Sequence, residues 1–303
     1  AARDAVAVTG GSALALTSLA ASAGVAPDAH LTLAGDLAAS AAATHTTDVQ
    51  AGTLAVAVSK AATTATLGTG AVLLGGNAVQ LTATSTDTTR ATSAQAALVS
   101  SAALTRADVQ AGPALDLAGN LILDARQNAT AAATGTGNAL VVADHQVGAA
   151  IQRSVSVLGS ITANAAGQSH TSALTASGGW APLPADALAA FGGLPSAQVV
   201  LPVTLAGAAR VQADARASAE LAAGLTISGV GGVQLSALMG GGSTAVVNGS
   251  AAVGTPGVAI NDADLRAVVT VASTPVASTP LVVHAGRGPP SVEFTTSAPV
   301  AVD

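Results

Sequence analysis

The sequence predicts an all-β fold, a parallel β-helix (β-solenoid) with coils of about 21 residues. Three observations predict this fold: apolar segments that recur at a nearly constant spacing, a side-chain alternation with a period of two, and a core composition of small residues. The expected organisation is solenoid repeats over residues 1–176, an insertion loop over 177–207, continued solenoid over 208–285, and a terminal strand or linker over 286–303.

The first recurring segment is an apolar alternation that carries a glycine at a fixed offset. The first four copies start about 41, 43 and 40 residues apart, within the range of spacings typical of solenoids. The copies begin at Leu31, Val72, Leu115, Val155 and Leu225, and their glycines are Gly35, Gly76, Gly119, Gly159 and Gly229. We expect these five glycines to form one corner of the coil, because glycine adopts a positive φ at the lowest cost.

A second apolar segment lies between these copies. It begins at Leu54, Leu98 and Leu140, and the starts are about 42 to 44 residues apart. Two strand-bearing units therefore alternate along the chain, and each averages about 21 residues.

The local period favours strands over helices. Leu115, Leu117, Leu121 and Leu123 alternate with residues that are mostly small or polar, which is the pattern of a half-buried strand. Alanine favours helix, but threonine, valine and frequent glycine oppose long helices. We therefore expect short strands joined by turns.

The composition excludes several classes of protein. The 303 residues are 50% hydrophobic but only 1% aromatic, which suits a thin core of Ala, Val and Leu. The chain has no cysteine, which excludes disulfide scaffolds, thiolate metal sites and cysteine nucleophiles. The net charge is −6 and the ten basic residues are scattered, so we expect no nucleic-acid partner. The chain has no uninterrupted apolar run of about 18 residues, so we expect no membrane span.

The expected insertion at 177–207 holds the single tryptophan, Trp180, and one of the two phenylalanines, Phe191. Exposed aromatic side chains are enriched at interfaces, so these two are candidate partner contacts. The alternative is that they fill a local hydrophobic pocket.

Few residues are arranged for chemistry. Asp116 and Asp124, with Arg126 beside them, form a candidate carboxylate pair, but the aromatic platforms of sugar-cleaving solenoids are missing. His30 and His45 are candidates to meet across coils, but we expect the histidines to be solvated residues of turns. Asp262 and Asp264 offer at most a weak calcium site. We expect no catalytic residues, no cofactor and no enzyme.

The segment at residues 62–84 consists of an expected strand, a glycine turn and a second strand with the pattern Gly-x-(Val/Leu)-x-(Val/Leu)-x-Ala. This sequence pattern resembles that of large repetitive bacterial surface proteins, in particular adhesins of the filamentous-haemagglutinin type. The resemblance covers residues 31–176 well and 211–272 more loosely. It implies a right-handed parallel β-helix, secretion, and a role as adhesin, stalk or matrix fibre. The secretion-domain asparagine motifs of two-partner exoproteins are not found, and no family binding site maps onto particular residues.

These observations predict a non-enzymatic structural segment of a secreted bacterial surface fibre or adhesin. Its expected partners are further copies of itself, head to tail or laterally, neighbouring domains of a longer chain, and host or cell-surface components. End-to-end assembly would give extracellular filaments, as in a biofilm matrix or in attachment between cells and surfaces. The alternative is a carbohydrate-active or glycan-binding β-helix, which Asp and Arg residues aligned across successive coils would favour.

Overall fold

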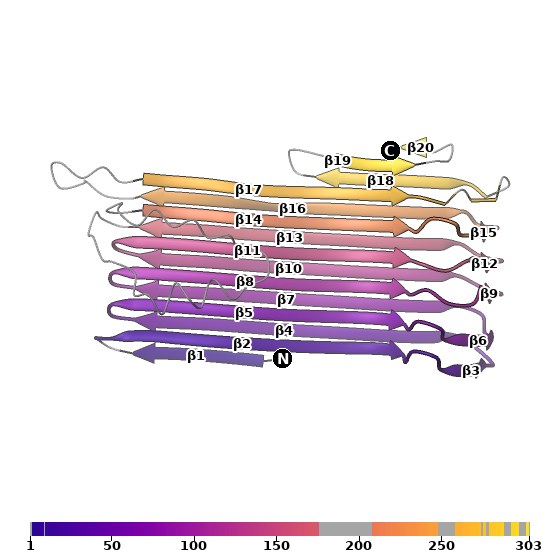
Figure 1. Ribbon diagram of the computed structural model, residues 1–303, viewed down its shortest axis with the longest axis horizontal. Coiled ribbons are helices and arrows are strands. Elements are labelled where there is room, and N and C mark those ends of the chain that lie inside the picture. Colours follow the sequence, from indigo (N-terminus) through magenta and orange to yellow (C-terminus); the bar gives the residue numbers. More distant parts are fainter. Residues whose placement is uncertain are drawn as a thin grey trace.

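The computed structural model describes residues 2–8, 10–175, 208–247, 258–273, 275–276, 279–287, 292–296 and 301–302. Within these ranges the chain forms strands, turns and bends, with no helix, and so no helix long enough to cross a membrane. The strands are parallel to their neighbours and stack in two large sheets and a narrow third side (Figure 1). The predicted parallel β-helix is confirmed.

The first sheet has eight strands among the described residues, in the order β1-β4-β7-β10-β13-β16-β18-β20. Their bounds are β1 Ala2–Val8, β4 Leu37–Ala51, β7 Val79–Ser93, β10 Leu121–Gly135, β13 Ile161–Thr175, β16 Val233–Val247, β18 Leu281–Arg287 and β20 Ala301–Val302.

The second sheet has seven described strands, in the order β19-β17-β14-β11-β8-β5-β2. Their bounds are β2 Ser12–Val25, β5 Leu54–Leu67, β8 Ala96–Val109, β11 Asn138–Ile151, β14 Ala208–Leu221, β17 Val258–Val271 and β19 Val292–Thr296. The narrow third side, called the short side below, carries β3 His30–Leu33, β6 Val72–Gly75, β9 Leu115–Leu117, β12 Val155–Val157 and β15 Ile227–Gly229.

One coil follows a long strand of the first sheet, reverses at a short turn, returns along the second sheet and crosses the short side. Leu37 of β4 pairs with Val79 of β7, so the chain advances 42 residues per coil here, as it does between Ala94 and Thr136. The predicted coil of about 21 residues is thus corrected: the two alternating units are the two halves of a single coil. Sequence spacing alone does not distinguish a coil from half a coil, because both halves carry the same alternation.

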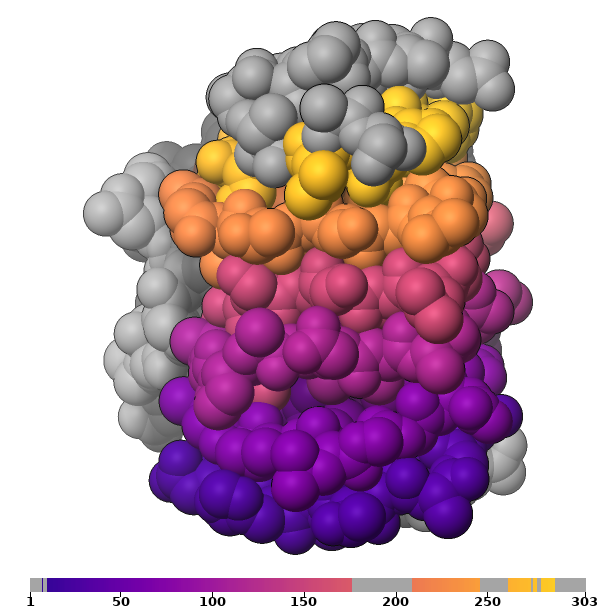
Figure 2. All heavy atoms as spheres, turned by 90° about the vertical axis from the view of Figure 1, so that its right-hand side faces the viewer, coloured from indigo at the N-terminus to yellow at the C-terminus, as the bar shows by residue number. Residues whose placement is uncertain are grey.

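The pairing register is continuous. β4 and β7 pair residue by residue from Leu37 to Ala51, and β10 pairs with β7 and β13 in the same way over its full length. Figure 2 shows the coils from the short side as layers that follow one another in sequence order. Between Thr175 and Ala208 the chain carries extra residues, yet β14 stacks directly on β11. The sheets therefore continue past the insertion. The tail also contributes described strands, β19 and β20.

Two apolar clusters fill the interior. The larger one lies beside the short side and includes Leu81, Leu121 and Ile161; the smaller one lies near the opposite turns and includes Ala55, Val99 and Val141. A run of buried polar side chains, the polar band, separates them. The polar band comprises His45, Thr47, Ser59, Thr63, Ser85, Asp87, Thr89, Ser101, Thr105, Gln127, His145, Ser169 and Thr171. Hydrogen bonds within it connect successive coils, as from Ser101 through His145 to Ser169.

The predicted corner glycines lie near the junction between the short side and the first sheet, but for a different reason than expected. Backbone hydrogen bonds join Gly35, Asn77, Gly119, Gly159 and Gly231 into one column along the axis. Only Gly76 of the five predicted glycines has a positive φ, of 96°, and it lies one residue before the column. Gly229 ends β15, two residues before the column member Gly231.

Close stacking explains the glycines at the column. A Cβ on Gly119 would lie 2.5 Å from the carbonyl oxygen of Asn77, and one on Gly159 would lie 2.7 Å from that of Gly119. A side chain has no room where these turns stack, whereas Gly35 at the first coil has nothing within 4 Å. The prediction therefore located the corner correctly. The expected positive φ is wrong for four of the five predicted glycines.

Candidate functional site

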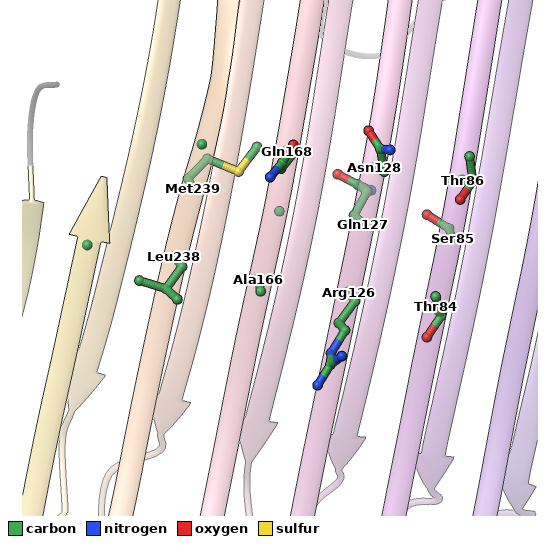
Figure 3. Close-up of a pocket in the computed structure, with 13 residues that line it drawn as sticks. Thr84, Ser85, Thr86, Arg126, Gln127, Asn128, Ala166, Gln168, Leu238 and Met239 are labelled. Carbon is green, nitrogen blue, oxygen red and sulfur yellow. The ribbon is translucent and has the colours of Figure 1, made fainter. Parts of the chain in front are cut away.

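A shallow groove crosses the outer face of the first sheet. Of the three hollows described in this section, it has the largest volume. It encloses about 630 Å³ and spans β7, β10, β13, β16 and β18 (Figure 3). The residues of this groove, called the outer groove below, are Thr84, Ser85, Thr86, Arg126, Gln127, Asn128, Ala166, Gly167, Gln168, Leu238, Met239, Gly240 and Gly286.

The register of the strands explains why the sheet is hollow here. Two outward columns of side chains cross the groove, and each ends in a glycine. The first runs from Thr84 to Arg126, Ala166, Leu238 and Gly286, and the second from Thr86 to Asn128, Gln168 and Gly240. Ala166, Gly240 and Gly286 leave the backbone uncovered, and the rest of the lining combines hydroxyl, amide and guanidinium groups with the apolar side chains of Leu238 and Met239.

Arg126 is the charged residue of the outer groove. Its Nη2 lies 3.0 Å from Oδ2 of Asp124, and Asn164 donates to Oδ1 of the same carboxylate at 2.8 Å. Asp124 is therefore committed to two neighbours on the sheet. Asp116, its expected partner in a carboxylate pair, lies on the short side in β9. The two carboxylates lie on different faces of the solenoid, so the structure does not assemble the predicted pair.

The outer face of the second sheet carries a charged ladder, which we define as two adjacent columns on β11, β14 and β17. One column stacks Asp144, Asp214 and Asp264, and the next stacks Gln146, Arg216 and Arg266. A hollow of about 200 Å³ lies at the acidic column, and one of about 150 Å³ lies beside the basic column.

The stacked carboxylates perturb one another. Partial burial raises the pKa of Asp214, the neighbouring charges of Asp144 and Asp264 raise it further, and Arg266 and Arg216 oppose the change. Arg266 also forms an ion pair with Asp264. A cationic or hydrogen-bonding group placed over the acidic column would relieve this repulsion.

Of the two expected calcium ligands, Asp264 belongs to this ladder and Asp262 lies beside it. Asp262 lies two residues before Asp264 on β17 and lines the same hollow. The described residues contain no group of three or more His, Cys, Asp or Glu side chains placed to hold a metal ion. The weak calcium site stays a prediction.

The histidines do not meet. His30 begins β3 on the short side and is exposed, whereas His45 lies inside the solenoid, where its Nδ1 shares a 3.0 Å hydrogen bond with Ser59 Oγ. The candidate contact across coils is not formed, because the two positions belong to different sides of the coil. Trp180 and Phe191 lie outside the described residues.

Two features were missed by the sequence reasoning. The charged ladder was hidden because its members do not follow one regular period: the insertion separates Asp144 and Asp214 by 70 positions, and a longer connection between β16 and β17 separates Asp214 and Asp264 by 50. The second is Arg153, which is 2% exposed at the corner between the second sheet and the short side. Its only sequence signal is a single arginine next to a buried apolar strand.

Comparison of the chain with protein-family models, with curated proteins and with solved structures finds no match to any of them.

Proposed function

We propose that this chain is a non-enzymatic structural segment of a secreted bacterial surface fibre or adhesin. The observation that carries the proposal is the unbroken in-register stacking of 14- and 15-residue strands over successive coils. Each coil adds one strand to both large sheets, so backbone hydrogen bonds run continuously along the axis. Such ladders resist extension along the axis, which is the mechanical demand on a fibre.

The end of the second sheet supports end-to-end association. Among the described strands, β2 pairs with β5 alone, and inward side chains of β2 such as Leu19 and Ala21 are partly exposed. A parallel strand with the same alternation completes this coil, because an open edge accepts further backbone hydrogen bonds. We propose that a second copy, or a neighbouring coil of a longer chain, supplies that strand.

The test is negative-stain imaging and light scattering of the purified chain over a range of concentrations. We expect filaments whose length grows with concentration. Leu19→Lys places a charge inside the edge coil and should prevent end-to-end growth, whereas Ser18→Lys on the outer face of the same strand should not. Discrete monomers at all concentrations would exclude self-assembly, and filaments that persist in Leu19→Lys would exclude this edge.

A glycan-binding β-helix is the second candidate, and the charged ladder favours it. Carboxylates aligned over three successive coils, with guanidinium groups beside them on two of these coils, offer repeated hydrogen-bonding partners to an extended polymer. The test is binding to a glycan panel, with release of reducing ends measured in parallel. Asp214→Asn should weaken binding, whereas Asp116→Asn on the short side should not. Binding that both variants retain would place the ligand elsewhere.

A further inference from the structure

Seven apolar side chains form a stripe on the outer face of the second sheet. The outer stripe consists of Leu54, Val56 and Val58 of β5, Ala96 and Leu98 of β8, and Leu140 and Val142 of β11. Their direction follows from the alternation of the strands: Ala55, Ala57, Ala97 and Val99 belong to the smaller interior cluster. The residues between them therefore point away from the core.

The outer stripe is buried although it points outward. Its members are between 1% and 8% exposed, with Leu98 at 1%. On the same face, Leu14 and Leu16 lie in line with Val56 and Val58 and are 49% and 64% exposed. In the described ranges the first sheet packs on the inner side of the second, and no described strand lies over the stripe.

We propose that residues 176–207 of this chain dock on the outer stripe. The chain leaves β13 at Thr175 and returns at Ala208, at the corner where preceding coils have a two-residue turn, such as residues 52–53. β5, β8 and β11 all begin at this corner, and the stripe occupies their first residues. β14 then stacks on β11, with Arg210 paired to Leu140 of the stripe. Both ends of the segment therefore lie beside the surface it would occupy.

The length and composition of the segment fit the stripe. Crossing three strands requires about 15 Å, and 32 residues reach several times that distance. The segment carries one charged residue, Asp186, against Trp180, Phe191 and several leucines and valines. Large apolar side chains packing on an apolar stripe would remove both surfaces from water. The aromatic residues considered above as partner contacts then serve an intramolecular contact.

The absence of cysteine permits a direct test on the full chain. Leu98→Cys, labelled with a benzophenone maleimide, places a photo-crosslinker at the centre of the stripe. We expect crosslinked peptides from residues 176–207 of the same molecule. Leu158→Cys, on a residue that is 68% exposed on the short side, is the control and should not give these peptides. Crosslinks to residues 248–257, or to a second copy, would overturn the proposal.

The unique Trp180 gives a second readout that needs no label. Leu98→Asp should shift its emission to longer wavelength and increase acrylamide quenching several-fold, while Leu158→Asp leaves both unchanged. Circular dichroism reports whether each variant keeps its strands. If Leu98→Asp fails to fold, the crosslinking result decides; if it folds with unchanged Trp180 emission and quenching, the segment does not dock there. Neither readout depends on filament formation.

Discussion

The guanidinium of Arg153 donates a hydrogen bond from Nη1 to the carbonyl oxygen of Ala71, 2.7 Å away and 82 residues earlier in the chain. Nη2 donates to Gly68 at 2.8 Å, and Nε donates to Gln110 at 2.6 Å. One side chain thus binds the turns of two preceding coils. Its burial lowers the pKa of the guanidinium, and the carbonyl acceptors offset the loss of hydration.

We therefore expect Arg153→Met to lower the free energy of unfolding by about 3 kcal/mol or more, because several buried carbonyls lose their donor. The free energy of unfolding of Arg153→Lys should lie between those of the parent chain and Arg153→Met, since an ammonium group cannot reproduce the planar fork of the guanidinium. Urea denaturation measures both. Arg126→Met, at a side chain 64% exposed, should change stability by less than about 0.5 kcal/mol. Equal losses at the two arginines would contradict the role of Arg153.

The glycine column makes a second prediction. Gly159→Ala places a methyl group against the carbonyl of Gly119, and we expect a loss of about 2 kcal/mol. Gly35→Ala, in the same column but with open space around it, should be within about 0.5 kcal/mol of the parent chain. Thermal unfolding of the pair is the measurement. A large loss at Gly35 would show that backbone conformation, and not stacking, selects glycine.

His145 makes stability depend on acid. Burial lowers its pKa to about 4, against an ordinary value of 6.5, with the charge of Asp144 opposing the shift. The unfolded chain therefore binds the proton first as the pH falls. This contribution to stability is complete above pH 6.5 and declines by about 3 kcal/mol towards pH 4.

Replacing His145 by Gln should abolish this part of the pH dependence. The stability difference between the parent and the variant, measured by urea denaturation at pH 7 and pH 4.5, should shift by a large part of that amount. His170→Gln, at an exposed position on β13, is the control that removes an imidazole from the surface. A difference for His145→Gln that stays constant with pH would mean that the buried imidazole does not resist protonation.

Asp108 has the opposite dependence. Burial raises the pKa of its carboxyl to about 6, although Arg106 and the backbone amide of Ala150 oppose the shift. The folded chain holds the proton more firmly than the unfolded chain, so stability falls as the pH rises from about 4 to about 6, and the full cost of this carboxylate is present above pH 6. Asp108→Asn should raise the free energy of unfolding at pH 7 on the order of 2 kcal/mol, and the gain should vanish near pH 4. Asp116→Asn is the exposed control, and a gain there of equal size would point to net charge as the cause.

The parts of the structure that could be predicted are those that repeat along the sequence at a constant spacing. The spacing of Leu31, Val72 and Leu115 identified the parallel β-helix and the neighbourhood of its glycine corner, because stacked coils repeat the same requirement at the same place. The number of sides per coil was not encoded in this way, since both halves alternate alike. The contact of Arg153 with Ala71 depends on how the turns of different coils stack at one corner, which the spacing does not reveal. The pairing of Asp144 with Asp214 depends on β14 resuming the register of β11 after the insertion.

The length of the coil has a consequence for the shape of any assembly. A 15-residue strand is about 50 Å long, whereas each additional coil of 42 residues adds only about 4.8 Å along the axis. The described coils therefore form a slab that is broader than it is tall. An assembly of such units would be a ribbon with a preferred bending direction, stiff within the plane of its sheets and more compliant across its thin dimension.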